Sequence, residues 1–268
     1  MVMRSFEPLR FAAMVLPVLL IAAAGCGQLA TDPAPVEGGL VLHVREIHDF
    51  TFSRVGTPDI ALFIESEREY NCANYRLDSE LDVKGQEISL SIRGIRTPEI
   101  CLAALGPAQF KTFLPGAEGE YSLRISHGGR TDRYTLSITR EAITLQREHA
   151  SFTRTAYGRF WRYPPLSFAY ICDSAGAHRE ACDRFRGVLR EQLAIEPFSF
   201  PAGGEIPYPQ SESGWGREWR AEYYRYPREE EYLRAGELLR SFIAENSGVM
   251  LSVMNWQNLS FRSWLGGN

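Results

Sequence analysis

The chain has 268 residues, of which 44% are hydrophobic and 23% charged, and its formal net charge at pH 7 is −4. This composition is that of an ordinary globular protein, and a mildly acidic chain has no general electrostatic attraction for nucleic acid. The length allows one large domain or two small ones.

The first 25 residues have the features of an export signal. Residues 1–10 carry Arg4 and Arg10, residues 11–24 are wholly apolar, and small residues lead to Cys26. A basic head, a short apolar run and a small-residue cleavage site are typical of a cleaved signal peptide. A membrane-spanning helix is the alternative, but it needs about 20 apolar residues, and this run is shorter and contains a proline.

The sequence AAGC at positions 23–26 resembles the lipobox of bacterial lipoproteins, although that family favours Leu where Ala23 stands. The resemblance covers residues 1–27. It implies cleavage before Cys26 and a diacylglyceryl group on the Cys26 thiol. Buried acyl chains would then hold the mature chain on a membrane, each CH₂ contributing about 0.8 kcal/mol. Gly27, in place of Asp, implies passage to the outer membrane of the cell envelope.

Residues 26–38 are polar and contain prolines and glycines, which predicts a tether. Residues 39–149 then contain short segments that are rich in Val, Ile, Leu, Tyr and Thr and in several cases alternate apolar with polar residues, as strands do. These segments are 40–47, 60–65, 87–95, 121–126, 133–139 and 142–148. Residues 97–107 are expected to form a short helix. We therefore predict an antiparallel β-sandwich domain of immunoglobulin-like size over 39–149.

The pattern changes after residue 149. Residues 150–166 contain a Pro-Pro pair and are predicted to be a linker. Over 167–268 the predicted order is strand, helix, strand, strand, helix, strand, which is that of a ferredoxin-like unit, followed by one additional strand. The strands are expected at 166–172, 194–200, 219–226, 248–256 and 259–265, and the helices at 174–193 and 227–246. The second domain is thus predicted to be α+β.

Four cysteines remain beyond Cys26. Cys72 and Cys101 lie in the first predicted domain, and Cys172 and Cys182 in the second. An even number in an oxidising compartment predicts disulfides. The simplest pairing, Cys72–Cys101 and Cys172–Cys182, joins cysteines within each domain.

A metal site is the alternative for the second pair. Cys172, His178 and Cys182 could be ligands together with Asp173 or Asp183, but zinc ligands are usually spaced more tightly and in pairs. The absence of C-x-x-C also disfavours a redox pair. We therefore predict no metal and no cofactor.

Motifs for catalysis are missing. The chain contains no G-x-S-x-G, no S-x-x-K and no glycine-rich phosphate loop. His43 and His48 are five residues apart, so they should lie on opposite faces of a strand. No catalytic residue is assigned. A glycosidase-type pair of carboxylates has no local signature, so an exported hydrolase of glycan or peptide, acting through carboxylates of the C-terminal domain, is the alternative function.

The segment 214–226 combines aromatic and arginine side chains. Trp215, Trp219, Tyr223 and Tyr224 are the candidate partner-binding residues, because exposed aromatic rings stack on sugars and anchor protein interfaces. The alternative is that the rings are core and the arginine stems cover them.

These features favour a non-catalytic binding or assembly module of the cell envelope. Its expected partners are the membrane, through the lipid anchor, and an envelope protein or glycan, with no nucleic acid.

Overall fold

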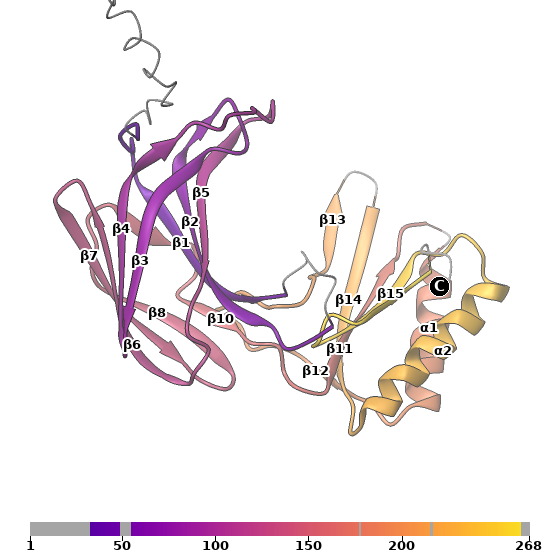
Figure 1. The fold of residues 1–268 in the computed structure, drawn as a ribbon. Coiled ribbons are helices and arrows are strands. Elements are labelled where there is room, and N and C mark those ends of the chain that lie inside the picture. The colour runs from indigo at the N-terminus through magenta and orange to yellow at the C-terminus, as the bar shows by residue number, and fades with distance from the viewer. Residues whose placement is uncertain (1–32, 49–54, 177, 215–216, 264–268) are drawn as a thin grey trace, which may run out of the picture. The chain divides into compact units, whose positions relative to one another are not determined.

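The computed structural model describes residues 33–48, 55–176, 178–214 and 217–263. The predicted signal peptide, Cys26 and Trp215 lie outside the described residues. The described part of the chain forms two β-sheets and two helices (Figure 1). None of its helices is long and apolar enough to cross a membrane.

The larger sheet has ten strands in the order β10-β8-β7-β6-β4-β3-β5-β2-β1-β9. Their bounds are β1 (Leu40–Ile47), β2 (Asp59–Tyr70), β3 (Arg76–Lys84), β4 (Glu87–Arg96), β5 (Gly106–Phe113), β6 (Gly119–His127), β7 (Arg130–Ile138), β8 (Ala142–His149), β9 (Thr153–Thr155) and β10 (Arg159–Trp161). Three neighbouring pairs are parallel: β1 with β9, β3 with β5, and β4 with β6. The expectation of a purely antiparallel sheet was therefore wrong, and the sheet is mixed.

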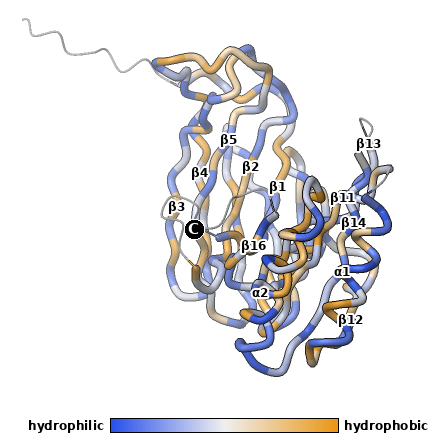
Figure 2. The backbone as a smooth tube through the Cα atoms, turned by 90° about the vertical axis from the view of Figure 1, so that its right-hand side faces the viewer, coloured by the Kyte–Doolittle hydropathy of each residue, from blue (hydrophilic) through white to orange (hydrophobic). Residues whose placement is uncertain are grey.

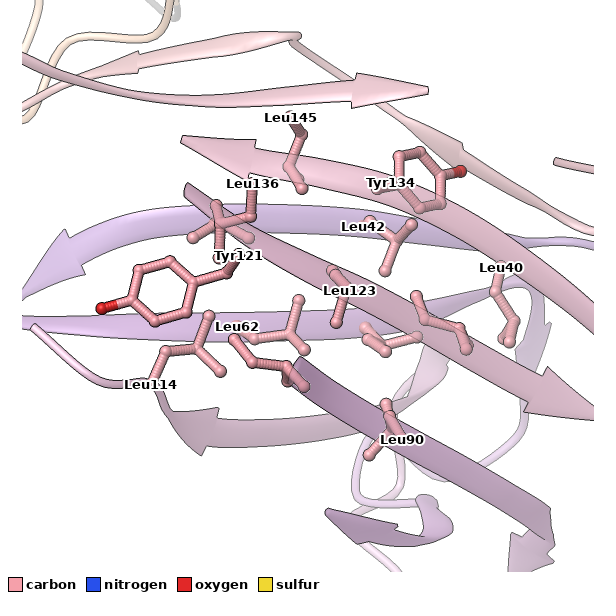
Figure 3. Packing of buried hydrophobic residues seen from close by; sticks show 14 of the residues in the cluster. Leu40, Leu42, Leu62, Leu90, Leu114, Tyr121, Leu123, Tyr134, Leu136 and Leu145 are labelled. Carbon is pink, nitrogen blue, oxygen red and sulfur yellow. The ribbon is translucent and has the colours of Figure 1, made fainter. Parts of the chain in front are cut away.

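Alternation explains the core of this sheet. In β1, Leu40, Leu42 and Val44 are buried, while the residues between them are more exposed. Alternate residues of β4, β6 and β7 and of the first half of β2 join the same hydrophobic cluster, so that Leu42 of β1 and Leu123 of β6 point into one core (Figure 3). Because β1 also contacts β8, which is far from it in the strand order, the sheet curls around this core.

Residues 97–105 are irregular rather than helical, so the expected short helix is corrected. The side chain of Asn74 explains the difference. Its Nδ2 donates to the carbonyl of Ile100 at 2.7 Å, and its Oδ1 accepts from the N–H of Leu102 at 3.0 Å. These bonds, together with the Cys72–Cys101 disulfide, replace the backbone bonds of a helix.

The smaller sheet has the order β12-β14-β11-β15-β16, with β13 also paired to β14, and all its pairs are antiparallel. The elements are β11 (Ser167–Asp173), α1 (His178–Gln192), β12 (Glu196–Phe198), β13 (Glu212–Gly214), β14 (Arg217–Arg225), α2 (Glu229–Glu245), β15 (Leu251–Asn255) and β16 (Ser260–Arg262). The predicted succession of strands and helices is confirmed, as is the final hairpin β15–β16; β13 was not predicted. One face of the sheet packs against Phe185 and Leu189 of α1 and Tyr232 and Leu239 of α2.

The segment 150–166, expected to be a linker, contributes β9 and β10 to the two edges of the larger sheet. Contacts between Cα atoms gather the chain from Pro33 onward into one compact unit.

Candidate functional site

Two adjoining cavities lie where the end of β1, the residues after β10, and the segment 205–212 meet. The larger has a volume of about 610 Å³ and the smaller about 170 Å³. The larger cavity is lined by Arg45, His48, Tyr163, residues 205–212, Met254, Asn258 and Arg262. The two cavities share Arg45, His48, Tyr163 and Glu205, so we treat them as one candidate site.

Strand β1 brings two ionisable residues to this site. Its buried positions are Leu40, Leu42 and Val44, and the alternation continues to Glu46 and His48, both also buried. A strand places every second residue on the same face, so Glu46 and His48 extend the core-facing row. His43 lies on the other face of β1, and His48 directly follows the last residue of the strand.

Glu46 is held by Arg162 and Tyr163. The Nε of Arg162 donates to its carboxylate at 2.7 Å, and the backbone N–H of Tyr163 donates at 2.6 Å. Burial raises the pKa of Glu46, and these hydrogen bonds offset only part of that rise. Both oxygens of Glu46 are therefore occupied, and its role is to fix the chain after β10.

His48 has an unusual environment. It is only 5% exposed, and its ring lies 5.0 Å from the ring of Tyr163. Its Nε2 atom is buried and has no hydrogen-bond partner within the described ranges. Burial lowers the pKa of His48, and Asp59 opposes this only in part, so the ring is neutral at pH 7.

The segment 201–205 runs beside β10. The backbone N–H of Trp161 donates to the carbonyl of Glu205 at 2.8 Å. The backbone N–H of Glu205 donates in turn to the carbonyl of Arg159 at 2.9 Å. Gly204 makes this approach possible, because a Cβ there would lie 3.0 Å from the carbonyl oxygen of Arg159. This pairing places Glu205 at the cavity.

The two carboxylate oxygens of Glu205 differ. Oε1 accepts from Nη1 of Arg45 at 3.2 Å. Oε2 is buried and has no partner in the part of the chain that the structure describes. The site therefore combines one neutral histidine nitrogen and one carboxylate oxygen, both of which lack a hydrogen-bond partner among the described residues.

Tyrosine hydroxyls hold the cavity wall. Tyr163 donates to the carbonyl of Pro207 at 2.8 Å, and Tyr223 donates to that of Pro209 at 3.0 Å. Burial raises the pKa of both tyrosines to about 12, so both remain donors at pH 7. The wall is thus a fixed part of the structure rather than a free loop.

The candidate partner-binding residues of β14 do not form one surface. Tyr224 is fully buried and stacks on Phe168 at 5.4 Å, so it is not one of the exposed rings that the prediction requires. Tyr223 faces the opposite side, half-buried, where it packs with Phe198, Phe200 and Tyr208. Trp219 is also half-buried and takes part in an interaction of its own. Tyr223 contacts the wall of the cavity through its hydrogen bond to the carbonyl of Pro209, and Trp219 pairs with Glu212 of the same wall through β13 and β14.

The cysteines pair as Cys72–Cys101 and Cys172–Cys182, which fits the predicted pairing. With both sulfurs of the second pair in a disulfide, neither is available as a thiolate ligand for zinc. Among the described residues, no group of three or more His, Cys, Asp or Glu side chains is placed to hold a metal ion.

Several acidic residues of the C-terminal part are engaged elsewhere. Glu222 accepts from Nη1 of Arg186 at 2.9 Å and from the hydroxyl of Tyr224 at 2.6 Å, and Glu231 accepts from the N–H of Ala194 at 3.1 Å. Glu205 differs in having a buried oxygen with no partner within the described ranges. Sequence reasoning missed it because its position depends on pairing with the distant strand β10. Glu46 and His48 could have been found by extending the alternation of β1.

The Nε2 atom of His48 and the Oε2 atom of Glu205 can together bind a group that both donates and accepts a hydrogen bond.

No protein-family model, no curated protein and no solved structure matches this chain.

Proposed function

We propose that the protein is an exported, lipid-anchored binding module of the cell envelope, and that the cavity beside His48 and Glu205 is its ligand site. One observation carries the assignment of the site. His48 Nε2 and Glu205 Oε2 are buried in the lining of the same cavity without partners among the described residues. Leaving such a group unpaired costs about 1–3 kcal/mol, and a complementary ligand removes that cost.

The ligand we propose is a glycan. A sugar hydroxyl can donate to Glu205 and accept from His48 when the proton is on Nε2. The neutral state of His48 suits an uncharged ligand, and the aromatic ring of Tyr163 in the lining suits the apolar face of a sugar. An envelope protein is the other partner that the sequence suggested. It would have to place a hydroxyl side chain inside the cavity.

Oligosaccharide-induced thermal stabilisation tests the site. The melting temperature of the full-length protein is measured with chitotetraose, maltotetraose and lipopolysaccharide core oligosaccharide, because a ligand that binds only the native state raises it. We expect the shift to be lost in His48→Ala and Glu205→Gln. The matched controls His149→Ala and Glu118→Gln, both at exposed positions, keep it. A shift that survives both cavity substitutions contradicts the site.

The same samples separate binding from hydrolysis. An exported hydrolase is the alternative function, and Glu205, with its unpartnered oxygen, is the carboxylate that favours it. Shortened oligosaccharides that form with the wild type and not with Glu205→Gln would establish the hydrolase. Intact oligosaccharides together with a thermal shift support the binding module.

The lipid anchor is tested separately. Intact-mass measurement of protein extracted from membranes is expected to show cleavage before Cys26 and a diacylglyceryl adduct, and Cys26→Ser is expected to abolish both. A wild-type protein that is recovered in soluble form without lipid contradicts the anchor and its outer-membrane location.

We also propose that the chain has two domains, an immunoglobulin-like sandwich over 39–149 and a ferredoxin-like α+β unit over 167–268. Two separate hydrophobic clusters support the division. The antiparallel order β12-β14-β11-β15 supports the second fold, because it suits two split β-α-β units. Hydrogen exchange during unfolding tests the proposal: two domains give two groups of amides with separate midpoints, and one domain gives a single midpoint.

A further inference from the structure

The loop between β4 and β5 exposes an unusual amount of apolar surface. Ile100, Leu102 and Leu105 are 79%, 59% and 73% exposed, and Ala103 and Ala104 between them are exposed as well. Isolated exposed apolar residues are normal on protein surfaces. A contiguous apolar group of this kind marks an interaction site.

The loop is held in this exposed conformation. The Cys72–Cys101 disulfide ties it to the turn after β2. The N–H of Ala73 donates to the carbonyl of Leu102 at 3.0 Å, and Asn74 bonds the backbone of the loop on both sides of Cys101. The apolar side chains are therefore presented by a fixed scaffold.

The described chain begins close to the base of this loop. Ala34 and Ile95 exchange two backbone hydrogen bonds, of 2.9 and 2.7 Å. Pro33 lies so close to Gly94 that a Cβ atom added to Gly94 would be 2.8 Å from the side chain of Pro33. Ile95 and Arg96 end β4, and the loop follows. The end of the larger sheet at which the described chain begins carries several hydrophobic stretches (Figure 2), and Figure 1 shows the turns next to β2 and β5 at this same end.

The proposed lipid anchor is near in sequence. Seven residues lead from Cys26 to Pro33, and a fully extended chain of that length reaches about 25 Å. A lipidated Cys26 thus keeps the base of the loop within about 25 Å of the bilayer surface, whatever path the tether takes.

We propose that residues 100–105 insert into the lipid surface and form a second membrane contact beside the acyl chains. The inference rests on the proposed lipid anchor. Apolar side chains that enter the lipid strengthen membrane attachment in proportion to the apolar area they bury, and this loop presents them on a fixed scaffold. Arg76 and Arg96, paired across β3 and β4 at the base of the loop and both exposed, suit lipid phosphates. Glu99 is the acidic residue of the loop and would remain in the headgroup layer.

Photolabelling by lipid tests the insertion. Full-length protein extracted from membranes is reconstituted into vesicles of phosphatidylethanolamine and phosphatidylglycerol that contain a phospholipid with a diazirine on its acyl chain. After illumination, reduction and tryptic digestion, lipid adducts are expected on peptide 97–111. They are not expected on peptide 229–234, which carries the exposed Leu233 of α2.

A matched pair of variants gives the control. The substitutions Ile100→Ser, Leu102→Ser and Leu105→Ser together are expected to abolish the adducts on 97–111 while the protein stays with the vesicles. The substitutions Val83→Ser, Tyr157→Ser and Leu233→Ser, at exposed apolar positions elsewhere, leave the adducts unchanged.

Two outcomes overturn the inference in different ways. A vesicle-bound wild type without adducts on 97–111 removes the second contact and leaves the lipid anchor intact. A wild type that does not associate with vesicles at all removes the anchor, and the second contact with it.

Discussion

Thr153 donates two hydrogen bonds to the same carboxylate oxygen of Asp132, from its backbone N–H at 2.8 Å and from its hydroxyl at 2.6 Å. Phe152 and Ser151 add further hydrogen bonds to this carboxylate. Asp132 belongs to β7 and Thr153 begins β9, which pairs with β1 at the edge of the larger sheet. The contact therefore joins strands that are far apart in the strand order and helps to keep the sheet curled.

Asp132 should make the stability of the protein depend on pH. Burial alone raises its pKa, but the hydrogen bonds from Thr153, Phe152 and Ser151 outweigh this and lower the pKa from 3.8 to about 2. A carboxyl group with a depressed pKa stabilises the fold above its unfolded pKa, and the contribution disappears as the pH falls from 3.8 toward 2.

We expect Asp132→Asn to lower the free energy of unfolding at pH 7 by about 2 kcal/mol, with a smaller difference from the wild type at pH 3. Urea unfolding at the two pH values measures it. Asp82→Asn, at an exposed position, is the control and should change little. An Asp132→Asn loss that is the same at both pH values would contradict the depressed pKa.

The two disulfides should differ in their access to reductant. Cys101 is exposed, whereas Cys172 and Cys182 are 0% and 3% exposed. Thiol–disulfide exchange requires that a thiolate reach a sulfur. Under native conditions we therefore expect dithiothreitol to open Cys72–Cys101 first, and Cys172–Cys182 to resist until the chain unfolds. Timed alkylation with peptide mapping gives the order, and equal rates for both pairs would show that burial does not protect the second.

The elements that could be predicted from sequence are those with a local signature. The apolar alternation predicted β1 and β4, because every second side chain enters the core. Strand β3 was missed because its sequence, RLDSELDVK, is largely charged, and its place in the sheet comes from β4 on one side and β5 on the other.

The loop 97–105 and the cavity depended on long-range contacts. The apolar run ICLAAL suits a helix, and nothing near it in sequence reveals that Asn74 and Cys72 fix it in another conformation. Glu205 likewise reaches the cavity only by pairing with β10. The alternation of β1 predicts that Glu46 and His48 face the core. It does not predict what these two polar residues do, because that depends on the residues they contact.

The two faces of β14 should respond differently to truncation. Tyr224 is fully buried, so Tyr224→Ala is expected to lower the free energy of unfolding by about 3–5 kcal/mol. Trp219 is half-buried on the other face, so Trp219→Ala should cost less. Thermal and urea unfolding of the two variants measure this, with Leu233→Ala, at an exposed position of α2, as the control. A greater loss for Trp219→Ala would show that the outer face of β14 is the better packed of the two.

The ion pair beneath the cavity should show the cost of isolating a buried charge. The side chain of Glu46 is 3% exposed and that of its partner Arg162 is 20% exposed. Removing one member of a buried pair leaves the other uncompensated and typically costs about 3–5 kcal/mol. We expect Arg162→Ala to lower the free energy of unfolding at pH 7 by an amount near the lower end of this range, because the N–H of Tyr163 still donates to Glu46. The exposed pair of Arg154 and Glu67 provides the control, and Arg154→Ala should change the stability little.

The pH dependence of Arg162→Ala follows from the direction of the Glu46 shift. Burial already raises the pKa of Glu46 above 4.5, and loss of Arg162 removes two of the effects that oppose this rise. A carboxyl group whose folded pKa is raised destabilises the fold as the pH rises past its unfolded pKa. The Arg162→Ala loss should therefore be smaller at pH 4 than at pH 7. Adding Glu46→Gln should restore much of it at pH 7, since no charge is then left in the core. If the double variant is no more stable at pH 7 than Arg162→Ala, the loss comes from the missing Arg162 contact with the carbonyl of Thr139 and not from the stranded charge.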